Sequence, residues 1–199
     1  MNTELQQRIH RIYSAIEAVE ETDPNKLKAT VITTDKIKMV FQNFRDGLSD
    51  EKLYNIVYML IYNITNLPGH LKKWAKHNGK DVKKIDMAFS KSLELKIISD
   101  LSNNDKHGYP PRNGKSQSGK CPQLVNIDRV MQLKTQAKKG SIIRMTLDAG
   151  GTPKFSGDGT AKAIITGDVV DNKNNRIGDL YAIATKAVEA CEQLLADFG

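Results

Sequence analysis

The sequence predicts an α+β protein that is mainly an up-and-down helical bundle, with a small antiparallel β-sheet inserted before the C-terminal helix. Apolar residues recur at helical spacing up to residue 107 and again from residue 179. Between these stretches, from Leu124, the apolar period changes to two, which is typical of strands. The 199 residues, 39% of them hydrophobic, suffice for one well-packed domain. We expect a single domain over 1–199, divided into a bundle (1–107), a basic loop (108–123), a β insertion (124–178) and a returning helix (179–198).

The N-terminal part predicts two helices. Thr3 and Gln6 form a capping-box pattern, and apolar residues at helical spacing carry the first helix to about Glu21. After Asp23-Pro24, β-branched residues come first and an amphipathic stretch follows. That stretch predicts a helix that Gly47 ends, and its start is open between Pro24 and Thr34. Its apolar residues are Ile37, Val40, Phe41 and Phe44.

The helix that begins at Ser49 is apolar nearly all round. A stripe of Tyr54, Tyr58 and Tyr62 at i+4 spacing accompanies its aliphatic residues. Such a helix is central in a bundle or shares one face with another subunit, so we expect a homo-oligomer, most simply a dimer. Aromatic residues at this period usually pack, although the stripe could also stack nucleic-acid bases.

Pro68 predicts the start of a short helix that Asn78-Gly79 ends. His70, Trp74 and His77 fall near one side of it. No carboxylate or cysteine stands at ligand spacing beside them, so we expect no metal. Asp81 then caps a turn or helix that runs to Phe89.

The stretch 92–107 predicts a helix with a polar row. Ser90 or Ser92 caps its start, and Gly108 with Pro110-Pro111 ends it near His107. The core-facing row begins at Leu93 and Ile97 and becomes polar in its second half. The polar members are Asp100, Asn104 and His107, with Asn103 at the edge.

Two interpretations of this polar row remain open. In the structural one, its side chains tie the helix end to neighbouring segments through hydrogen bonds. In the functional one, His107 donates or accepts a proton and Asp100 orients its ring. Lys106 and Arg112 would then hold phosphate.

The basic residues are concentrated in the middle of the chain. The net charge is +7, and residues 71–139 hold 16 Lys or Arg against 6 Asp or Glu. A concentrated positive field attracts RNA or DNA, acidic proteins or lipid surfaces, although a lysine-rich solvated face has the same composition. The candidate nucleic-acid-binding residues are Lys72, Lys73, Lys76, Lys106, Arg112, Lys115 and Lys120.

Several classes of activity find no support in the sequence. Gly108, Gly114, Lys115 and Ser116 approach a phosphate-binding loop, but the glycine spacing is one residue too long and a helix precedes them. No nucleophilic or paired-carboxylate hydrolase motif is present. We expect no cofactor. Whether the chain is an enzyme stays open, and the sequence favours a protein that is not one.

No apolar run reaches membrane-spanning length, and the N-terminus lacks the pattern of a secretion signal. We expect a soluble, cytoplasmic protein with no membrane partner. Cys121 and Cys191 stand far apart in unlike contexts, so we expect both to be reduced.

The C-terminal part predicts strands and one helix. The stretches 124–135, 141–148 and 162–170 alternate like strands, and the segments between them are rich in turn residues. Asp179 caps the last helix. Its apolar seam is Leu180, Ala184, Ala187, Cys191, Leu194 and Phe198.

A helical bundle in which one helix ends in NNDKHG before a basic loop resembles the HEPN superfamily over roughly residues 50–110. HEPN ribonucleases carry an Arg, four to six residues and a His at the end of one helix, and they cleave RNA as dimers without metal. His107 matches the histidine. The positions for the arginine are Asp100, Leu101 and Ser102, none of them basic, so the resemblance implies a non-catalytic relative.

Two functions follow as expectations. The first is a nucleic-acid-associated protein, HEPN-like and either non-catalytic or weakly RNA-acting. The second is a non-enzymatic module for helical dimerisation or protein interaction. Salt dependence of binding distinguishes them, because phosphate contacts release counterions and a bundle interface does not.

Overall fold

The structure is a computed structural model, and it divides into two compact units that are described here separately. Unit 1 comprises Met1–Glu17, Tyr54–Ile127 and Thr166–Gly199, and unit 2 comprises Ala18–Leu53 and Asp128–Ile165. The expectation that they form one domain stays a prediction. The residues described are 3–18, 29–33, 38–42, 45, 47–109, 116–136, 139–148 and 153–198.

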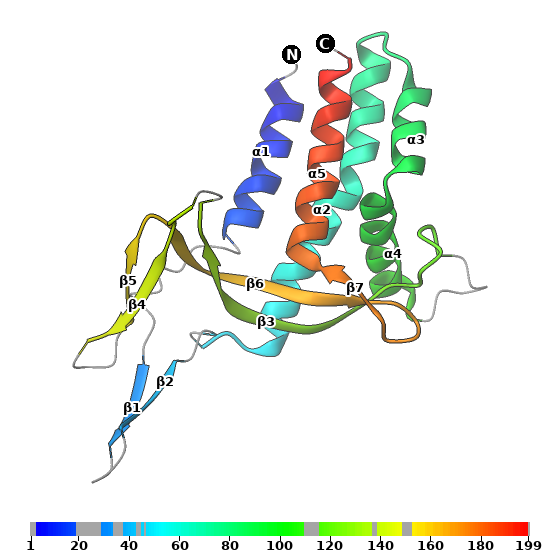
Figure 1. Cartoon of the computed structure of the whole chain (residues 1–199). Helices are drawn as coiled ribbons and strands as arrows, with labels where there is room; N and C mark the ends of the chain where they lie inside the picture. The colour runs from blue at the N-terminus through cyan, green and yellow to red at the C-terminus, as the bar shows by residue number, and fades with distance from the viewer. Residues whose placement is uncertain are drawn as a thin grey trace. The chain divides into compact units, whose positions relative to one another are not determined.

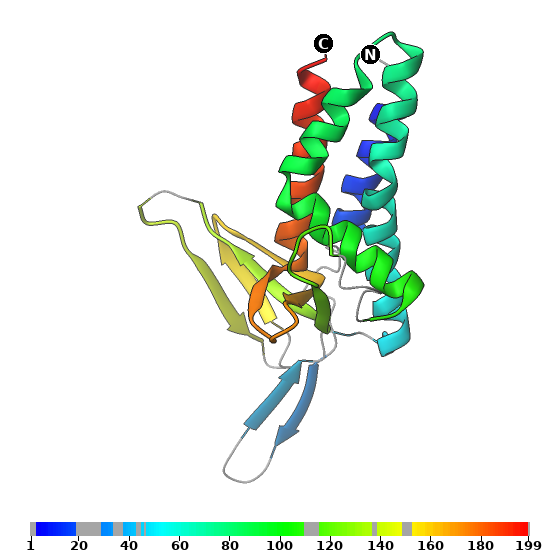
Figure 2. The same ribbon diagram turned by 90° about the vertical axis from the view of Figure 1, so that its right-hand side faces the viewer.

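The predicted fold class, a mainly helical α+β protein with small antiparallel sheets, is confirmed. Figures 1 and 2 show α1, α2, α3 and α5 side by side with nearly parallel axes, while α4 is inclined to them. The helices are α1 (Thr3–Ala18), α2 (Asp50–His77), α3 (Val82–Lys91), α4 (Leu93–His107) and α5 (Leu180–Ala196).

The core of unit 1 forms where the apolar faces of these helices meet. Ile64 and Leu71 of α2, Ile85 of α3 and Ile98 of α4 are fully buried. Burial of such side chains contributes about 1.5–3 kcal/mol each. The seam predicted on α5 is confirmed, since all six of its residues are buried: Leu180, Ala184, Ala187, Cys191, Leu194 and Phe198.

The helix ends follow the capping residues in the sequence. Ser92 is the N-cap of α4, and its Oγ accepts a hydrogen bond from Leu95 N at 3.2 Å. Gly108 takes a φ of 83° at the C-cap and donates its N–H to Asn104 O at 2.9 Å. Asp81 caps α3 in the same way as Ser92 caps α4. These predicted boundaries are confirmed.

The predicted break at Pro68 is wrong, because α2 continues through it from Asp50 to His77. Proline removes one helical hydrogen bond and costs about 3 kcal/mol in a helix interior. The residues around it, Ile64, Leu67 and Leu71, are at most 1% exposed. Their burial on both sides of Pro68 outweighs that cost.

The prediction of a helix that ends at Gly47 is also wrong for the part of it that the structure describes. Ala29–Thr33 (β1) and Lys38–Gln42 (β2) form an antiparallel pair in which Val31 lies opposite Val40. The rest of that prediction, residues 24–28 for a start at Pro24 and residues 34–37, 43, 44 and 46 for either start, lies outside the described residues. Val40 and Phe41 favour strand as readily as helix, and the pairing with β1 decides.

The remaining strands form two further sheets. β3 (Gln123–Lys134), β6 (Thr160–Val170) and β7 (Arg176–Asp179) form one, in the order β3-β6-β7. β4 (Ile143–Leu147) and β5 (Pro153–Gly157) pair in the other. The sequence predicted β3, β4 and β6, whereas β5 lies in a stretch predicted as turn-rich and β7 was not predicted.

Asp179 joins β7 to α5. Its carboxylate accepts hydrogen bonds from Thr166 Oγ1 of β6 at 2.8 Å and from Ala182 N at the start of α5 at 3.2 Å. It is the predicted N-cap of that helix, and this prediction is confirmed. None of the helices described here is both long and apolar enough to cross a membrane.

Candidate functional site

A polar cleft of about 230 Å³ opens between α1 and α2 in unit 1. Ile12 of α1 and Leu67 of α2 are buried at its base. The other residues that line it carry guanidinium, imidazole or amide groups, and no carboxylate is among them. They are Arg8, Arg11, Asn63, Asn66 and His70.

The position of α1 follows from its buried residues. Leu5, Ile9 and Ile12 are each no more than 6% exposed. Arg8 and Arg11 are one turn apart in the same helix and therefore lie together on the side facing α2. Figure 1 shows α1 running alongside the bundle helices.

The Arg8 guanidinium crosses the cleft to α2. Its Nη1 lies 3.0 Å from Nε2 of His70 in a part-buried hydrogen bond. A guanidinium only donates, so Nε2 of His70 accepts and the ring proton of the neutral imidazole is on Nδ1. This bond fixes the plane of the guanidinium inside the cleft.

Arg11 supplies the second positive charge. Its Nε donates weakly to Gln7 O at 3.4 Å within α1, and its terminal nitrogens form no hydrogen bond with a described residue. Two parallel N–H groups of an arginine match the oxygens of a phosphate. The exposed amides of Asn63 and Asn66 add neutral donors opposite it.

The polar face of α2 extends beyond the cleft toward the C-terminal end of the helix. Asn63, Asn66, His70, Lys73 and His77 are spaced 3, 4, 3 and 4 residues apart, which places them in one row. Lys73 and His77 are exposed. The row therefore adds an ammonium and a second imidazole beyond the cleft, and it contains no acidic residue.

The sequence prediction missed this cleft. It named Lys73 as a nucleic-acid-binding residue and His70 as a rejected metal ligand, and it did not name Arg8, Arg11, Asn63 or Asn66. The polar row of α2 was visible in the sequence at helical spacing. Its pairing with α1, more than fifty residues away, was not.

A larger cleft of about 610 Å³ lies between α1 and α5. Ile9, Leu195 and Ala196 make it mostly apolar. Tyr13 closes part of it by donating its hydroxyl to Glu192 at 2.8 Å. Burial, and then Glu192, raise the pKa of Tyr13 well above its ordinary range. Its polar lining residues include the carboxylate of Glu192, whereas the cleft between α1 and α2 has two arginines and no carboxylate, so the latter is the better candidate site for an anion.

Asp100, predicted as a partner of His107, binds the 116–118 loop instead. Its carboxylate is 2% exposed and accepts hydrogen bonds from Gln117 N at 2.7 Å and Ser118 N at 2.8 Å. The hydroxyls of Ser116 and Ser118 each donate to it at 2.6 Å. This arrangement, here called the Asp100 latch, fastens the loop to α4.

The other residues of the predicted polar row differ in their surroundings: one is hydrogen-bonded and two are exposed. Asn104 donates its amide to Pro122 O at 2.8 Å, which is the kind of tie that the structural interpretation predicts. Asn103 and His107 are exposed, and neither forms a hydrogen bond with a described residue. Leu93 is 40% exposed, so the row does not face the core along its whole length. The structure does not bring His107 to Asp100.

The predicted basic residues fall into two groups on unit 1. Lys72 pairs with Asp86 of α3, and Lys73 and Lys76 are exposed near the end of α2. Lys106 lies over the ring of Tyr62 at 4.8 Å. Tyr62 precedes Lys76 by 14 residues in α2, which corresponds to about 21 Å along the axis. The remaining predictions are Lys120, which is exposed, and Arg112 and Lys115, which lie outside the described residues.

The other candidate chemistry concerns metals and thiols. In the part of the chain that the structure describes, no three His, Cys, Asp or Glu side chains gather in a way that would hold a metal ion. Cys121 is partly exposed and Cys191 is buried, and both are free thiols. Burial, and then the charge of Glu192, raise the pKa of Cys191 to about 12.

Comparison with known proteins gives no family to which these features belong. No family model, no curated protein sequence and no solved structure matches the chain.

Proposed function

We propose that the protein binds nucleic acid through its phosphate backbone, and that the cleft between α1 and α2 is the contact site. The observation that carries this proposal is the convergence of Arg8 and Arg11 with His70 in an open cleft lined by no carboxylate. Backbone binding needs several cations and amide donors along one surface.

The surrounding charge supports the same partner. Residues 71–139 carry a large excess of Lys and Arg, and Lys73 continues the polar row of α2 from the cleft. A field of one sign raises the local concentration of a polyanion and speeds its encounter with the cleft. Phosphate is thus attracted first by the basic surface and then held by the two arginines.

This proposal includes the likeness to HEPN proteins, and specifically to their non-catalytic members. Helices α2, α3 and α4 span the residues concerned, and α4 ends at His107. His107 is exposed at that end, and it is not among the residues that line the cleft with Arg8 and Arg11. We propose binding, without strand cleavage, as the role of this bundle.

A fluorescence-anisotropy titration tests the proposal. Labelled 20-nucleotide RNA and DNA strands are titrated with the wild type and with the Arg8→Gln/Arg11→Gln variant at 50 mM and 200 mM salt. We expect at least a tenfold weakening in the variant at low salt. The slope of log affinity against log salt should fall by about 1.4 for a single strand, because two phosphate contacts are lost.

The matched control removes the same charge outside the cleft. Lys91 of α3 and Lys186 of α5 are exposed, and the Lys91→Gln/Lys186→Gln variant has the same net charge as the cleft variant. It should weaken binding less than threefold. Equal loss in the two variants, or no binding of either strand by the wild type at 50 mM salt, contradicts the proposal.

A homodimer through α2 is the second candidate function. Met59 is 62% exposed and Tyr54 is 44% exposed, so this helix presents apolar surface that a second copy could cover. Sedimentation velocity at micromolar concentration tests it, and a monomer that persists to 100 μM excludes it. Such an interface should be insensitive to salt, in contrast to phosphate contacts.

A further inference from the structure

We infer that the nucleic acid is bound as a single strand, with unpaired bases stacked on the tyrosine ladder, defined as Tyr54, Tyr58 and Tyr62 of α2. This inference rests on the proposed nucleic-acid binding and adds the class of strand that is bound. Bases inside a duplex have both faces covered by their neighbours, so only an unpaired base can lie against an exposed ring.

The rings of the ladder form a continuous aromatic strip. The centroids of Tyr54 and Tyr58 are 6.3 Å apart with planes 15° from parallel. Tyr58 and Tyr62 are also 6.3 Å apart, with planes tilted by 44°. Tyr54 is the most exposed of the three, while Tyr58 and Tyr62 are half-buried. The strip is anchored by its inner rings and open at Tyr54.

The end of α4 holds the ladder in place and supplies a charge. Tyr62 donates its hydroxyl to Asp105, which fixes the orientation of the ring. Lys106, the next residue, places its ammonium 4.8 Å from the centroid of that ring. Proteins that bind single strands combine positive charges, which contact the phosphate backbone, with aromatic rings, which stack on the bases. Lys106 and the ladder provide both.

The environment of Tyr58 and Tyr62 keeps these two phenols uncharged. Burial, followed by the charge of Asp105 and the neighbouring tyrosines, raises the pKa of Tyr58 to about 12. The hydrogen bond to Asp105, followed by burial, raises the pKa of Tyr62. Neither phenol therefore adds a negative charge that would repel a phosphate.

The ladder and the cleft lie on the same helix and suit one strand. Tyr62 and Asn66 are one turn apart on α2, and Asn66 lines the cleft that holds the two arginines. A strand whose phosphates lie at Arg8 and Arg11 can thus cross the exposed side of α2 and reach the rings. Phosphate contacts at the cleft set the affinity for any nucleic acid, and stacking sets the preference for unpaired bases.

The test compares strand preference in two variants. A 20-nucleotide poly-dT or poly-U strand and a 20-base-pair duplex are titrated with the wild type, with Tyr54→Leu/Tyr58→Leu and with Met59→Leu. Leucine keeps apolar bulk but removes the stacking face, and the Tyr58 hydroxyl forms no hydrogen bond with a described residue that the change would break. Met59 is an exposed neighbour on the same helix and serves as the matched control.

We expect the wild type to bind the single strand at least tenfold more tightly than the duplex. The tyrosine variant should lose about tenfold on the single strand and less than twofold on the duplex, while the Met59→Leu variant changes neither. Trp74 fluorescence and circular dichroism confirm that each variant is folded.

Three outcomes overturn the inference, and only the last of them also overturns the proposed function. The first is equal affinity for single strand and duplex that the tyrosine substitutions leave unchanged. In that case the proposed function still stands if the Arg8→Gln/Arg11→Gln variant loses binding. A wild-type dimer that the tyrosine substitutions convert to monomer identifies the ladder as a subunit interface. Absence of binding to every nucleic acid removes both.

Discussion

The two units of the chain bury their apolar residues to different degrees. In unit 1, Ile61, Ile64 and Leu71 of α2 are completely buried among the neighbouring helices. Unit 1 also exposes large apolar residues such as Met59, but among the described residues it holds ten of the eleven largest fully buried side chains, and unit 2 holds only Leu53. Five large apolar residues of unit 2 are 39–54% exposed. These residues are Val130, Leu133, Ile142, Met145 and Leu147.

The difference comes from how many neighbours each element has. A bundle helix is covered on several sides, whereas β4 is paired with β5 alone in a two-stranded sheet. Ile143, Met145 and Leu147 alternate along one face of β4, and two of the three are about half exposed or more. Two-stranded sheets are only marginally stable by themselves. We therefore expect the stability of the chain to reside chiefly in unit 1.

The largest effect should come from deleting a core side chain in unit 1. Leu71→Ala leaves a cavity in α2 and should lower the free energy of unfolding by about 3–4 kcal/mol. Met145→Ala in unit 2 removes a similar volume from an exposed site and should change it by less than about 0.5 kcal/mol. Urea unfolding followed by the fluorescence of Trp74, the only tryptophan and a residue of unit 1, measures the first. Thermal unfolding by circular dichroism measures the second, and equal losses would refute the contrast.

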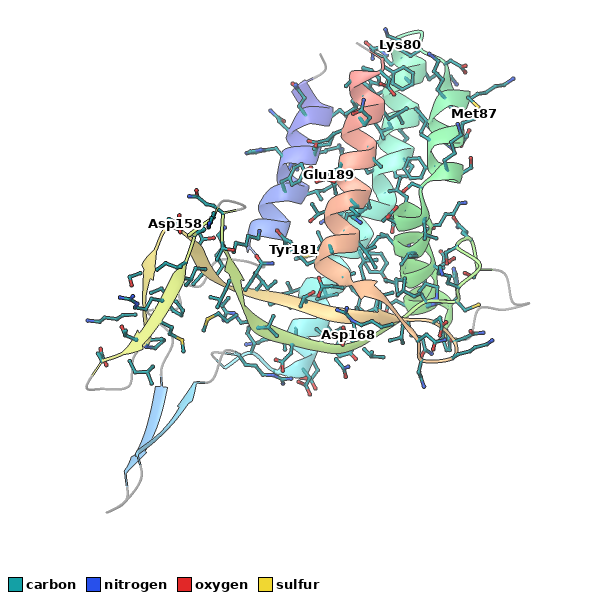
Figure 3. All side chains as sticks on the ribbon, in the orientation of Figure 1. Lys80, Met87, Asp158, Asp168, Tyr181 and Glu189 are labelled. Carbon is teal, nitrogen blue, oxygen red and sulfur yellow. The ribbon has the colours of Figure 1, made fainter. Side chains whose placement is uncertain are left out.

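The next effect concerns two carboxylates that organise loops, one in each unit. Asp100→Ala should lower the free energy of unfolding by about 2–3 kcal/mol, since it removes a buried carboxylate and leaves four part-buried donors of the Asp100 latch without their acceptor. Asp158, labelled in Figure 3, accepts hydrogen bonds from Ser141 Oγ at 2.9 Å and Ile142 N at 3.0 Å, but it is exposed, so water can replace it. Asp158→Ala should cost below about 1 kcal/mol. Urea unfolding of both variants decides, and a loss from Asp158→Ala as large as that from Asp100→Ala contradicts the comparison.

Alkaline pH should weaken unit 1 through Cys191. The unfolded thiol ionises near its ordinary pKa of 9.0, whereas burial keeps the folded thiol protonated until about 12. Its contribution is complete below pH 9 and is lost as the pH rises toward 12, because the folded state then binds the extra proton. From pH 8 to pH 10.5 the loss should be about 2 kcal/mol.

The control for the pH experiment is the variant that lacks the thiol. Cys191→Ala should show a clearly smaller loss of unfolding free energy over the same pH range, measured by urea unfolding through Trp74. If the two proteins lose stability in parallel, the dependence on pH comes from other groups. Tyr58 adds a smaller contribution of the same sign, since its pKa is also raised to about 12.

The smallest effect on stability should come from adding a methyl group at Gly157 in unit 2. Gly157 has a φ of 118°, and a Cβ there would lie 2.2 Å from the backbone oxygen of Ile142. Gly157→Ala should cost about 1–2 kcal/mol of local stability by forcing the β4–β5 pair apart. Limited proteolysis should then cut this pair faster than in the wild type. Gly140→Ala is the control, because it has a positive φ of 87° and nothing within 4 Å of its Cβ position. Equal rates in the two variants would show that the close approach at Ile142 has no effect.

Local residue chemistry predicted much of unit 1. The caps Ser92, Asp81 and Asp179 and the seam of α5 were all identified, because each depends on residues within one helix. Pro68 was misread since the burial of Ile64 and Leu71 around it depends on other helices. The strand β2 was misread for the same reason, because its partner β1 decides its conformation.

The candidate site was harder to predict because it is made by two distant helices. The row Asn63, Asn66 and His70 is visible in the sequence, but nothing there shows that Arg8 faces it. The opposite case is Asp100, whose helical spacing favoured His107 as its partner. A returning loop provides four donors to the carboxylate, and spacing along one helix cannot reveal such a loop.

The Asp100 latch has a consequence for the exchange of amide hydrogens with solvent. Backbone N–H groups in surface loops ordinarily exchange with deuterium quickly, because brief openings expose them. Those of Gln117 and Ser118 are instead held by a carboxylate that is 2% exposed on α4. Their exchange therefore requires α4 to release the loop, and these two loop amides should be protected like the amides inside that helix. A short stretch outside any helix or strand thus records the opening of the helical bundle.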